Sequence, residues 1–173
     1  MNTVYVLYGC PASGKSTWAK ETVRRSNGRI KRVNKDELRA MIDVGGGWSN
    51  DNEKFVLSIR DKIAMKALMN GSDIVIDDTN FPFGGKHYLR MCEIAKLVGD
   101  VQVVEKYFDI SLKEALVRNQ NSDRVPVPDM IIENMFKRHI LNSHYTCKTA
   151  YFPPLEKMKQ DILLPHCIIF DID

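Results

Sequence analysis

The sequence lacks long apolar segments and the features of a secretory leader. No run of apolar residues approaches the roughly 20 needed to cross a bilayer. The N-terminus enters an apolar, strand-like run within three residues and does not show the basic and then apolar layout of a signal peptide. These absences predict a cytoplasmic protein without membrane contact.

Cysteine and histidine are too few and too scattered to predict a disulfide framework or a metal site. The four cysteines form no C-x-x-C pair, which favours reduced thiols over bridges or bound zinc. The four histidines lack the spacing of metal ligands, and we interpret them as structural or surface residues.

Neither sign of charge is in large excess, but the positive charge is unevenly distributed. The 173 residues carry a net charge of +3, with 44% apolar and 27% charged residues, as expected for one ordinary globular domain. Between Lys15 and Arg39 there are nine Lys or Arg and three Asp or Glu residues, so this segment sums to +6 and the rest of the chain to −3. Such a segment would attract a polyanion. Alternatively, its charges only form a solvated helix face and loop.

The most informative stretch matches the phosphate-loop pattern G-x-x-x-x-G-K-[ST]. It follows an apolar run at 4–8 and opens a helical run at 17–26, and this context argues against a simple glycine turn. Its backbone N–H groups and the helix N-terminus would cradle phosphates, while the lysine reaches the β- and γ-phosphates. We therefore expect ATP as a ligand, with the hydroxyl of Ser16 on Mg²⁺. The expected ATP-binding residues are Gly9, Cys10, Pro11, Ala12, Ser13, Gly14, Lys15, Ser16 and Thr17.

Strand and helix patterns alternate along the chain, which predicts an α/β fold. We expect a parallel sheet of the P-loop-kinase type, with four to five strands, helices on both faces and a lid loop. Strands are expected at 4–8, 30–33, 74–76 and 101–108. After the capping-box-like residues 50–53, a helix is expected that places Phe55, Ile59 and Ile63 on one face.

Asp36, just beyond the second expected strand, is the candidate general base. Ligands of doubly wound sheets collect at the carboxyl ends of the strands, and phosphoryl transfer to an alcohol needs a group that accepts the hydroxyl proton. The alternative is an aspartate that is favoured at a helix N-terminus by the dipole. Arg39 would share the face of Asp36 and bind a substrate phosphate, or simply pair with Asp36.

Asp78 ends the apolar run at 74–76, where an acid can serve Mg²⁺ through water. Asp77 competes with it for this role, and sequence alone does not order the two. Thr79 and Asn80 either hydrogen-bond the substrate or make the turn.

Arg118 and Arg124 flank a polar loop at 119–123. Arginines on a mobile loop can close over a triphosphate and stabilise the transferring charge, although Arg118 alone could be a cation at a helix C-terminus. Trp48 is a candidate for stacking on a base, whereas Trp18 is expected in the core.

Residues 9–19, 34–39, 78–80 and 117–119 carry a resemblance to the bacteriophage polynucleotide kinase–phosphatase family that covers nearly the whole chain. In that family an N-terminal P-loop domain transfers the γ-phosphate of ATP to a 5′-hydroxyl of RNA or DNA during end repair. The resemblance implies a cytoplasmic enzyme, in the host cell if phage-encoded, that binds nucleic-acid ends and forms an oligomer at full length.

The resemblance also assigns roles to individual residues. It implies Lys15 and Ser16 on the triphosphate and Mg²⁺, Asp36 as the general base and Arg39 on the phosphate 3′ of the acceptor nucleoside. It further implies Asp78, Thr79 and Arg118 at the active site. The chain departs from the family at Ser122, where a second lid arginine is expected, and Arg124 is the candidate substitute.

The C-terminal residues 170–173 resemble the opening of a phosphatase motif, D-x-D-G-T, up to its glycine. We therefore expect residues 1–155 to form the kinase domain. Residues 156–173 are expected to form a connector and the first strand of a phosphatase domain, without phosphatase activity.

Two other functions compete with this prediction. A small-molecule P-loop kinase would not need the basic stretch at 20–39. A non-catalytic nucleotide- or nucleic-acid-binding module would not need Asp36, Asp78 and Arg118 together. RNA and DNA ends are both compatible with the residues above.

Overall fold

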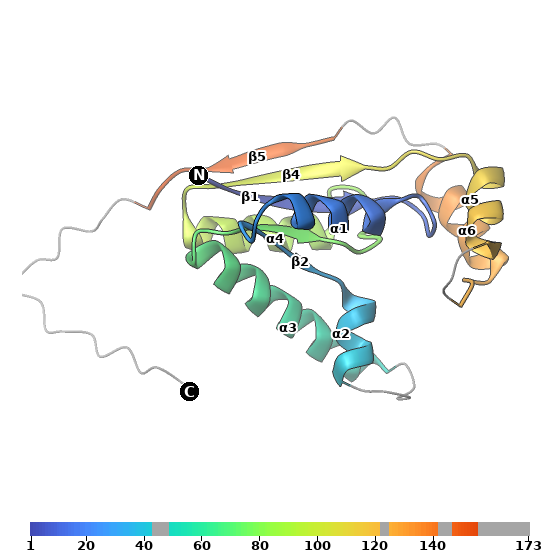
Figure 1. Ribbon diagram of the computed structural model, residues 1–173, viewed down its shortest axis with the longest axis horizontal. Coiled ribbons are helices and arrows are strands. Elements are labelled where there is room, and N and C mark those ends of the chain that lie inside the picture. Colours follow the sequence, from blue (N-terminus) through green and yellow to red (C-terminus); the bar gives the residue numbers. More distant parts are fainter. Residues whose placement is uncertain (43–48, 122–124, 142–146, 156–173) are drawn as a thin grey trace, which may run out of the picture.

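A five-stranded sheet organises the molecule (Figure 1). The computed structural model describes residues 1–42, 49–121, 125–141 and 147–155. Within them the strand order is β2-β3-β1-β4-β5. The central strand β1 (Asn2–Tyr8) pairs in parallel with β3 (Asp73–Ile76) and β4 (Val101–Tyr107), and β2 (Ile30–Val33) pairs in parallel with β3. The predicted α/β fold is confirmed.

The edge strand β5 (Thr149–Phe152) is not predicted by the sequence pattern. It is four residues long and antiparallel to β4, with Val104 opposite Thr149 and Val101 opposite Phe152. Its burial alternates between exposed and half-buried residues, so it carries no buried apolar run. Short edge strands of this kind leave little trace in hydrophobic periodicity.

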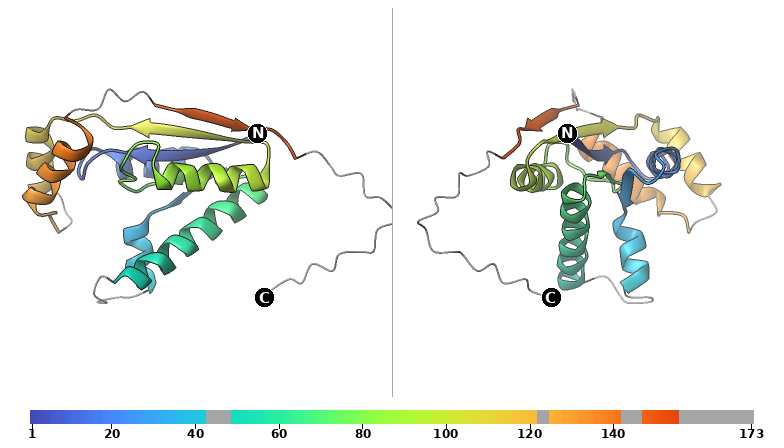
Figure 2. Two further views of the ribbon diagram at one scale, coloured as in Figure 1. Left: turned by 180° about the vertical axis from the view of Figure 1, so that it is seen from behind. Right: turned by 60° about the vertical axis from the view of Figure 1, so that its left-hand side comes forward.

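Helices cover both faces of the sheet (Figure 2). Successive residues of β1 point to opposite faces, so Leu7 packs under Ala19 of α1 (Lys15–Arg25), whereas Val4 and Val6 face the other side. That other side is covered by α3 (Asn50–Met69) and α4 (Lys86–Val98). Trp18 is half-buried on α1, where it meets the rings of Tyr5 and Phe108 edge-on. It packs against the core, in agreement with the position expected for it.

The helix α3 packs through a different face from the one the sequence suggests. Of the three residues expected on one face, Phe55 is 49% exposed and Ile63 is 36% exposed, whereas Ile59 is partly buried against the core. The face turned inward instead carries Val56, Arg60, Ala64, Ala67 and Leu68. Apolar residues lie on more than one side of α3, so the pattern predicted the helix but not the side that packs. This inward face includes Arg60, a fully buried arginine that the hydrophobic pattern does not predict.

The remaining helices stand at the carboxyl ends of the parallel strands. They are α2 (Lys35–Ile42), α5 (Leu112–Gln120) and α6 (Asp129–His139). Cys10, at the start of the phosphate loop, packs with Ile110, Ala115, Ile132 and Phe136. This cluster fastens α5 and α6 directly to the phosphate loop.

Some expectations fall on residues that the structure does not describe. Trp48, Arg124 and the segment 156–173 lie outside the described residues, so the roles expected there stay predictions. None of the helices in the described ranges is long and apolar enough to cross a membrane.

Candidate active site

The loop between β1 and α1 has the backbone of an anion site. Gly9 has a φ of 151°, and a Cβ there would lie 2.5 Å from the Oγ of Ser13, so a side chain does not fit. Gly14 caps α1 with a φ of 95°, and its carbonyl accepts from the N–H of Trp18 at 3.0 Å. The first turn of α1 contains no acidic residue. No carboxylate of the helix itself therefore offsets its N-terminal N–H groups.

Lys15 closes this loop from inside. Its side chain is buried, and its Nζ donates to the carbonyls of Gly9 at 2.8 Å and Cys10 at 2.7 Å. The hydroxyl of Ser13 lies 3.3 Å from the same nitrogen. The loop thus holds one positive charge among its own oxygens, at the place where phosphate oxygens would approach.

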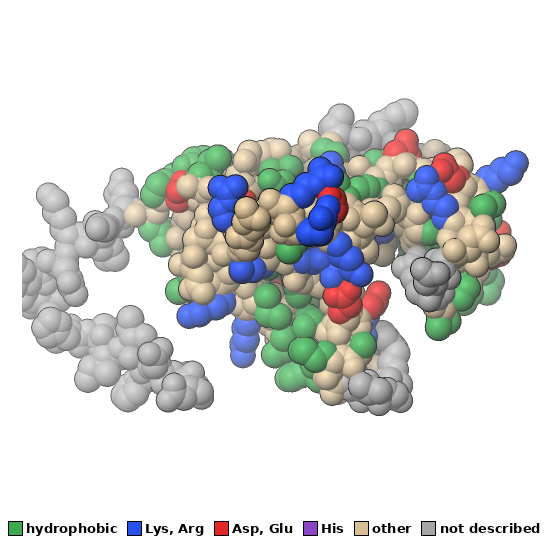
Figure 3. All heavy atoms as spheres, in the orientation of Figure 1, with side chains coloured by type: hydrophobic (Ala, Val, Ile, Leu, Met, Phe, Trp, Pro, Cys, Tyr) green, Lys and Arg blue, Asp and Glu red, His purple; other side chains and the backbone are tan. Residues whose placement is uncertain are grey.

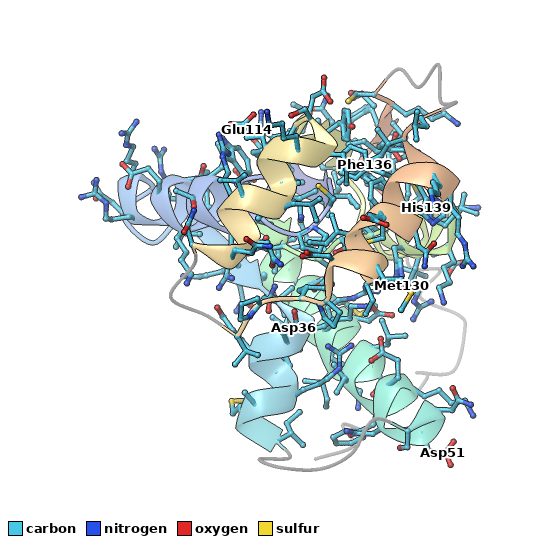
Figure 4. The ribbon with its side chains drawn as sticks, turned by 90° about the vertical axis from the view of Figure 1, so that its right-hand side faces the viewer. Asp36, Asp51, Glu114, Met130, Phe136 and His139 are labelled. Carbon is cyan, nitrogen blue, oxygen red and sulfur yellow. The ribbon has the colours of Figure 1, made fainter. Side chains whose placement is uncertain are left out.

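A cavity of about 560 Å³ opens beside this loop. It brings the phosphate loop together with Asp36 from the start of α2, Arg118 from α5 and the two aspartates after β3. Figure 4 shows Asp36 at the end of α2 that faces α5 and α6. The lining residues are Pro11, Ala12, Ser13, Gly14, Lys15, Ser16, Thr17, Lys20, Asn34, Asp36, Asp77, Asp78, Thr79, Arg118 and Val127.

Asp77, rather than Asp78, meets the serine of the phosphate loop. The Oγ of Ser16 donates to Oδ1 of Asp77 at 3.2 Å, and the Nε of Arg32 donates to Oδ2 at 2.7 Å. A hydroxyl beside a carboxylate forms the hard oxygen pair that Mg²⁺ prefers. Among the described residues no three His, Cys, Asp or Glu side chains gather into a metal site. Ser16 and Asp77 are the residues that could hold Mg²⁺ here together with phosphate oxygens.

Asp78 has a different set of partners. Its Oδ1 accepts from the backbone N–H of Lys35 at 2.8 Å, and its Oδ2 lies 3.7 Å from Nη1 of Arg60. Burial raises the pKa of Asp78, and the charges of Lys35 and Arg60 oppose that shift. Asp78 thus anchors the first turn of α2, although it lines the cavity too.

Thr79 and Asn80 separate in the structure. Thr79 lines the cavity, but Asn80 is buried and its amide donates to the carbonyls of Leu7 at 2.8 Å and Ile76 at 3.2 Å. Asn80 has a φ of 56°, in the left-handed region. The geometry therefore favours the turn-making role of Asn80 over substrate contact.

Asp36 and Arg39 form one unit with Glu53 of α3. The side chain of Asp36 is 87% exposed, and its carboxylate accepts from Nη1 of Arg39. Glu53 accepts from Nε of Arg39 at 3.1 Å and from Nζ of Lys35 at 3.2 Å. Burial opposes the charge on Arg39, yet the carboxylates of Glu53 and Asp36 outweigh it and raise the pKa of Arg39. Glu53 therefore fixes the guanidinium that orients Asp36.

Arg118 reaches the cavity from the last turn of α5, with half of its side chain exposed and an ion pair to Glu114 at 2.5 Å. The neighbouring Asn119 is fully buried. Its amide donates to the carbonyl of Val127 at 2.7 Å and accepts from the N–H of Val127 at 3.0 Å. This pair of bonds closes the loop between α5 and α6 at its base.

The comparisons with known proteins agree with this geometry. A family model described as an AAA domain matches residues 4–138, which is most of the chain. The chain belongs to the AAA-domain family. This AAA domain has the P-loop kinase architecture, with the nucleotide-binding loop at the carboxyl end of β1.

Three relatives illustrate the range of proteins that this AAA domain is similar to. The L-seryl-tRNA(Sec) kinase of Methanococcus maripaludis is 28% identical over 136 residues, which is 77% of this chain and 51% of that protein. A chain in the structure of the Pnkp1/Rnl/Hen1 RNA repair complex superposes with a TM-score of 0.67 at 20% identity, over 91% of this chain and 50% of that one. Kti12 of Chaetomium thermophilum, in complex with ADP-AlF3, superposes with a TM-score of 0.56 at 21% identity, over 79% of each chain.

These likenesses have defined limits. The chain spans about half the length of the first two relatives. The solved structures show a shared fold, because their sequence identity to this AAA domain is low.

Three residues of the AAA-domain site are absent from the sequence predictions. Arg32, Glu53 and Arg60 hold Asp77, Arg39 and Asp78 respectively. In the sequence, Arg32 contributes only to the basic segment, Glu53 belongs to the capping-box-like residues, and Arg60 lies inside an expected helix. No local pattern marks such partners, because they meet the site only through the packing of β2 and α3.

Proposed function

We propose that this chain transfers the γ-phosphate of ATP to a 5′-hydroxyl end of RNA or DNA. The observation that carries the proposal is the cavity in which the exposed carboxylate of Asp36 shares one space with the phosphate loop. A base that faces a held triphosphate is the minimum arrangement for phosphoryl transfer to an alcohol.

The reaction needs few groups beyond those in the cavity. Asp36 accepts the proton of the attacking 5′-hydroxyl, whose oxygen forms the new bond to the γ-phosphorus. The bond from that phosphorus to the β–γ bridging oxygen breaks, and ADP leaves. Lys15 and Arg118 stabilise the charge on the transferring group. Ser16 and Asp77 would hold Mg²⁺, which neutralises phosphate charge when bound.

Three features support a polynucleotide as the acceptor. Arg39, held by Glu53, lies one helical turn beyond Asp36, where it can contact a phosphate next to the reacting nucleoside. One relative is named as an L-seryl-tRNA(Sec) kinase, so a similar protein acts on an RNA-bound substrate. The basic segment around α1 adds long-range attraction for a polyanion.

A transfer assay with γ-labelled ATP tests the proposal. Wild-type protein is incubated with single-stranded RNA and DNA that carry a 5′-OH, with the same strands carrying a 5′-phosphate, and with nucleosides and gluconate. Label on the 5′-OH strands alone is expected. Preferential labelling of nucleosides or gluconate would instead establish a small-molecule kinase, and absence of transfer to every acceptor would leave a binding module.

A further inference from the structure

Arg60 is the largest fully buried side chain of the described residues, and it lies in the middle of α3 with 1% exposure. A guanidinium removed from water needs both hydrogen-bond partners and an opposite charge. Its surroundings therefore indicate what this charge stabilises.

One partner of Arg60 is its neighbour Asp61. Oδ1 of Asp61 accepts from Nη2 of Arg60 at 2.7 Å and from Nε at 3.1 Å. Asp61 also accepts, through Oδ2, from Arg90 of α4 at 2.8 Å. Asp61 is thus shared between two arginines, of which Arg90 also pairs with Glu93 at 2.8 Å.

The other side of Arg60 points toward the candidate site. Its Nη1 lies 3.2 Å from Nδ1 of His87 and 3.7 Å from Oδ2 of Asp78. Burial and the charge of Arg60 lower the pKa of His87 to about 4, so His87 is neutral at pH 7 and adds no competing charge. Within the described residues Oδ2 of Asp78 is buried without a hydrogen-bond partner, and Arg60 is the cation beside this oxygen, while the charge of Lys35 also acts on the carboxylate.

Asp78 transmits this contact to α2. Its second oxygen, Oδ1, accepts from the backbone N–H of Lys35, the residue that immediately precedes Asp36. The two oxygens of one buried carboxylate thus join Arg60 of α3 to the first turn of α2. The order of contacts is Arg60, Asp78, the Lys35 amide and then Asp36.

We propose that Arg60 is a positioning residue that holds Asp78 against the N-terminus of α2 and thereby sets the place of Asp36. The catalytic part of this inference rests on the proposed function. The alternative is that Arg60 only joins α3 to α4 through Asp61 and His87.

A double-mutant cycle separates these two roles. Arg60→Met removes the charge at similar length, and Asp78→Asn keeps an acceptor for Lys35 but needs no counter-charge. In the wild-type background, Arg60→Met is expected to lower kcat by on the order of 10- to 100-fold, with KM for ATP within about threefold. In the Asp78→Asn background the same change is expected to alter kcat less than about twofold. Equal losses of kcat in both backgrounds would overturn the proposal.

Arg90→Met is the matched control, because it breaks a bond to the same Asp61 without approaching Asp78. It is expected to leave kcat within about twofold of wild type. A loss as large as that of Arg60→Met would show that the α3–α4 connection, and not Asp78, is what matters. If Arg60→Met gives no cooperative thermal transition, Arg60→Gln, which is polar but uncharged, takes its place under the same criteria.

Hydrogen exchange of the Lys35 amide tests the inference without any substrate. Arg60→Met is expected to speed this exchange by about tenfold, and adding Asp78→Asn is expected to restore most of the protection. Unchanged exchange in Arg60→Met would refute the contact itself. If wild-type protein transfers no phosphate to any 5′-OH end, the proposed function fails, while the exchange result still decides whether Arg60 holds Asp78 against α2.

Discussion

Asp36 is the most exposed charged residue of the candidate site and pairs with its neighbour Arg39. Asp36→Asn removes the proton acceptor without changing the shape of the side chain. Turnover is expected to fall by on the order of 10² to 10⁴, with ATP affinity within about threefold of wild type. Single-turnover kinetics and calorimetry with ADP measure the two quantities.

Asp51→Asn is the control for that change, because Asp51 is similarly exposed, lies in the first turn of α3 and pairs with Lys54. It should leave turnover unchanged. Full activity of Asp36→Asn, or an equal loss from Asp51→Asn, would remove Asp36 from the role of base.

His87 gives the protein a predictable dependence of stability on pH. Burial and the charge of Arg60 lower its pKa to about 4 from the ordinary 6.5. Between these values the unfolded chain binds the proton and the folded chain does not. The contribution of His87 to the free energy of unfolding is therefore fully present above pH 6.5 and declines as the pH falls toward 4. The whole decrease in unfolding free energy is about 3 kcal/mol.

The change His87→Gln tests this dependence. The loss of unfolding free energy between pH 7 and pH 4.5, measured with urea, is expected to be smaller in the variant by about 2 to 3 kcal/mol. Identical pH profiles of wild type and variant would contradict a neutral, buried His87.

At the scale of elements, the base of the loop between α5 and α6 depends on Asn119. Asn119→Ala removes two hydrogen bonds to the backbone of Val127, a half-buried residue. We expect the variant to lose about 2 kcal/mol of unfolding free energy and to bind ATP more weakly, since Arg118 stands beside the released loop. Urea unfolding and ADP titration measure both effects.

Asn121→Ala is the matched control for the loop, because Asn121 is an exposed cap residue two positions on. It is expected to cost less than about 0.5 kcal/mol. Normal ATP affinity in a folded Asn119→Ala protein would show that the loop base does not position Arg118.

The two elements that differ most from prediction are α3 and β5. For α3 the 3.6-residue pattern established a helix, but Phe55 and Val56 are both apolar and only one of them is buried. For β5 the four residues are too short and too exposed to show a period of two. Both outcomes depend on packing against elements distant in sequence, namely β3, α4 and β4.

At the scale of the whole molecule, positive charge gathers on the face that α1 covers (Figure 3). Glu21 pairs with both Arg24 and Arg25, and so leaves one of these charges unbalanced. Arg24→Ala together with Arg25→Ala is expected to raise KM for a long 5′-OH oligonucleotide. The slope of log KM against log salt concentration should also fall, because fewer counterions are released. The expected decrease is about 0.7 for each phosphate that the two arginines neutralise in the wild-type protein.

Lys62→Ala with Lys66→Ala is the control for this face, since both lysines are exposed on α3 across the sheet. The control should leave KM and its salt slope unchanged, and neither pair should affect a dinucleotide acceptor. Equal salt slopes for wild type and the Arg24/Arg25 variant would exclude this face from the nucleic-acid path.

The sequence by itself determined the phosphate loop, the succession of strands and helices along the chain, and the candidates Lys15, Ser16 and Asp36. These features are local, because a loop, its strand and its helix are contiguous in the chain. Only the tertiary structure decided that Asp77 meets Ser16, that Asp78 anchors α2 and that Asn80 makes the turn. It also brought Glu53 and Arg60 to the site, because the phase at which a helix packs is set by its neighbours across the core.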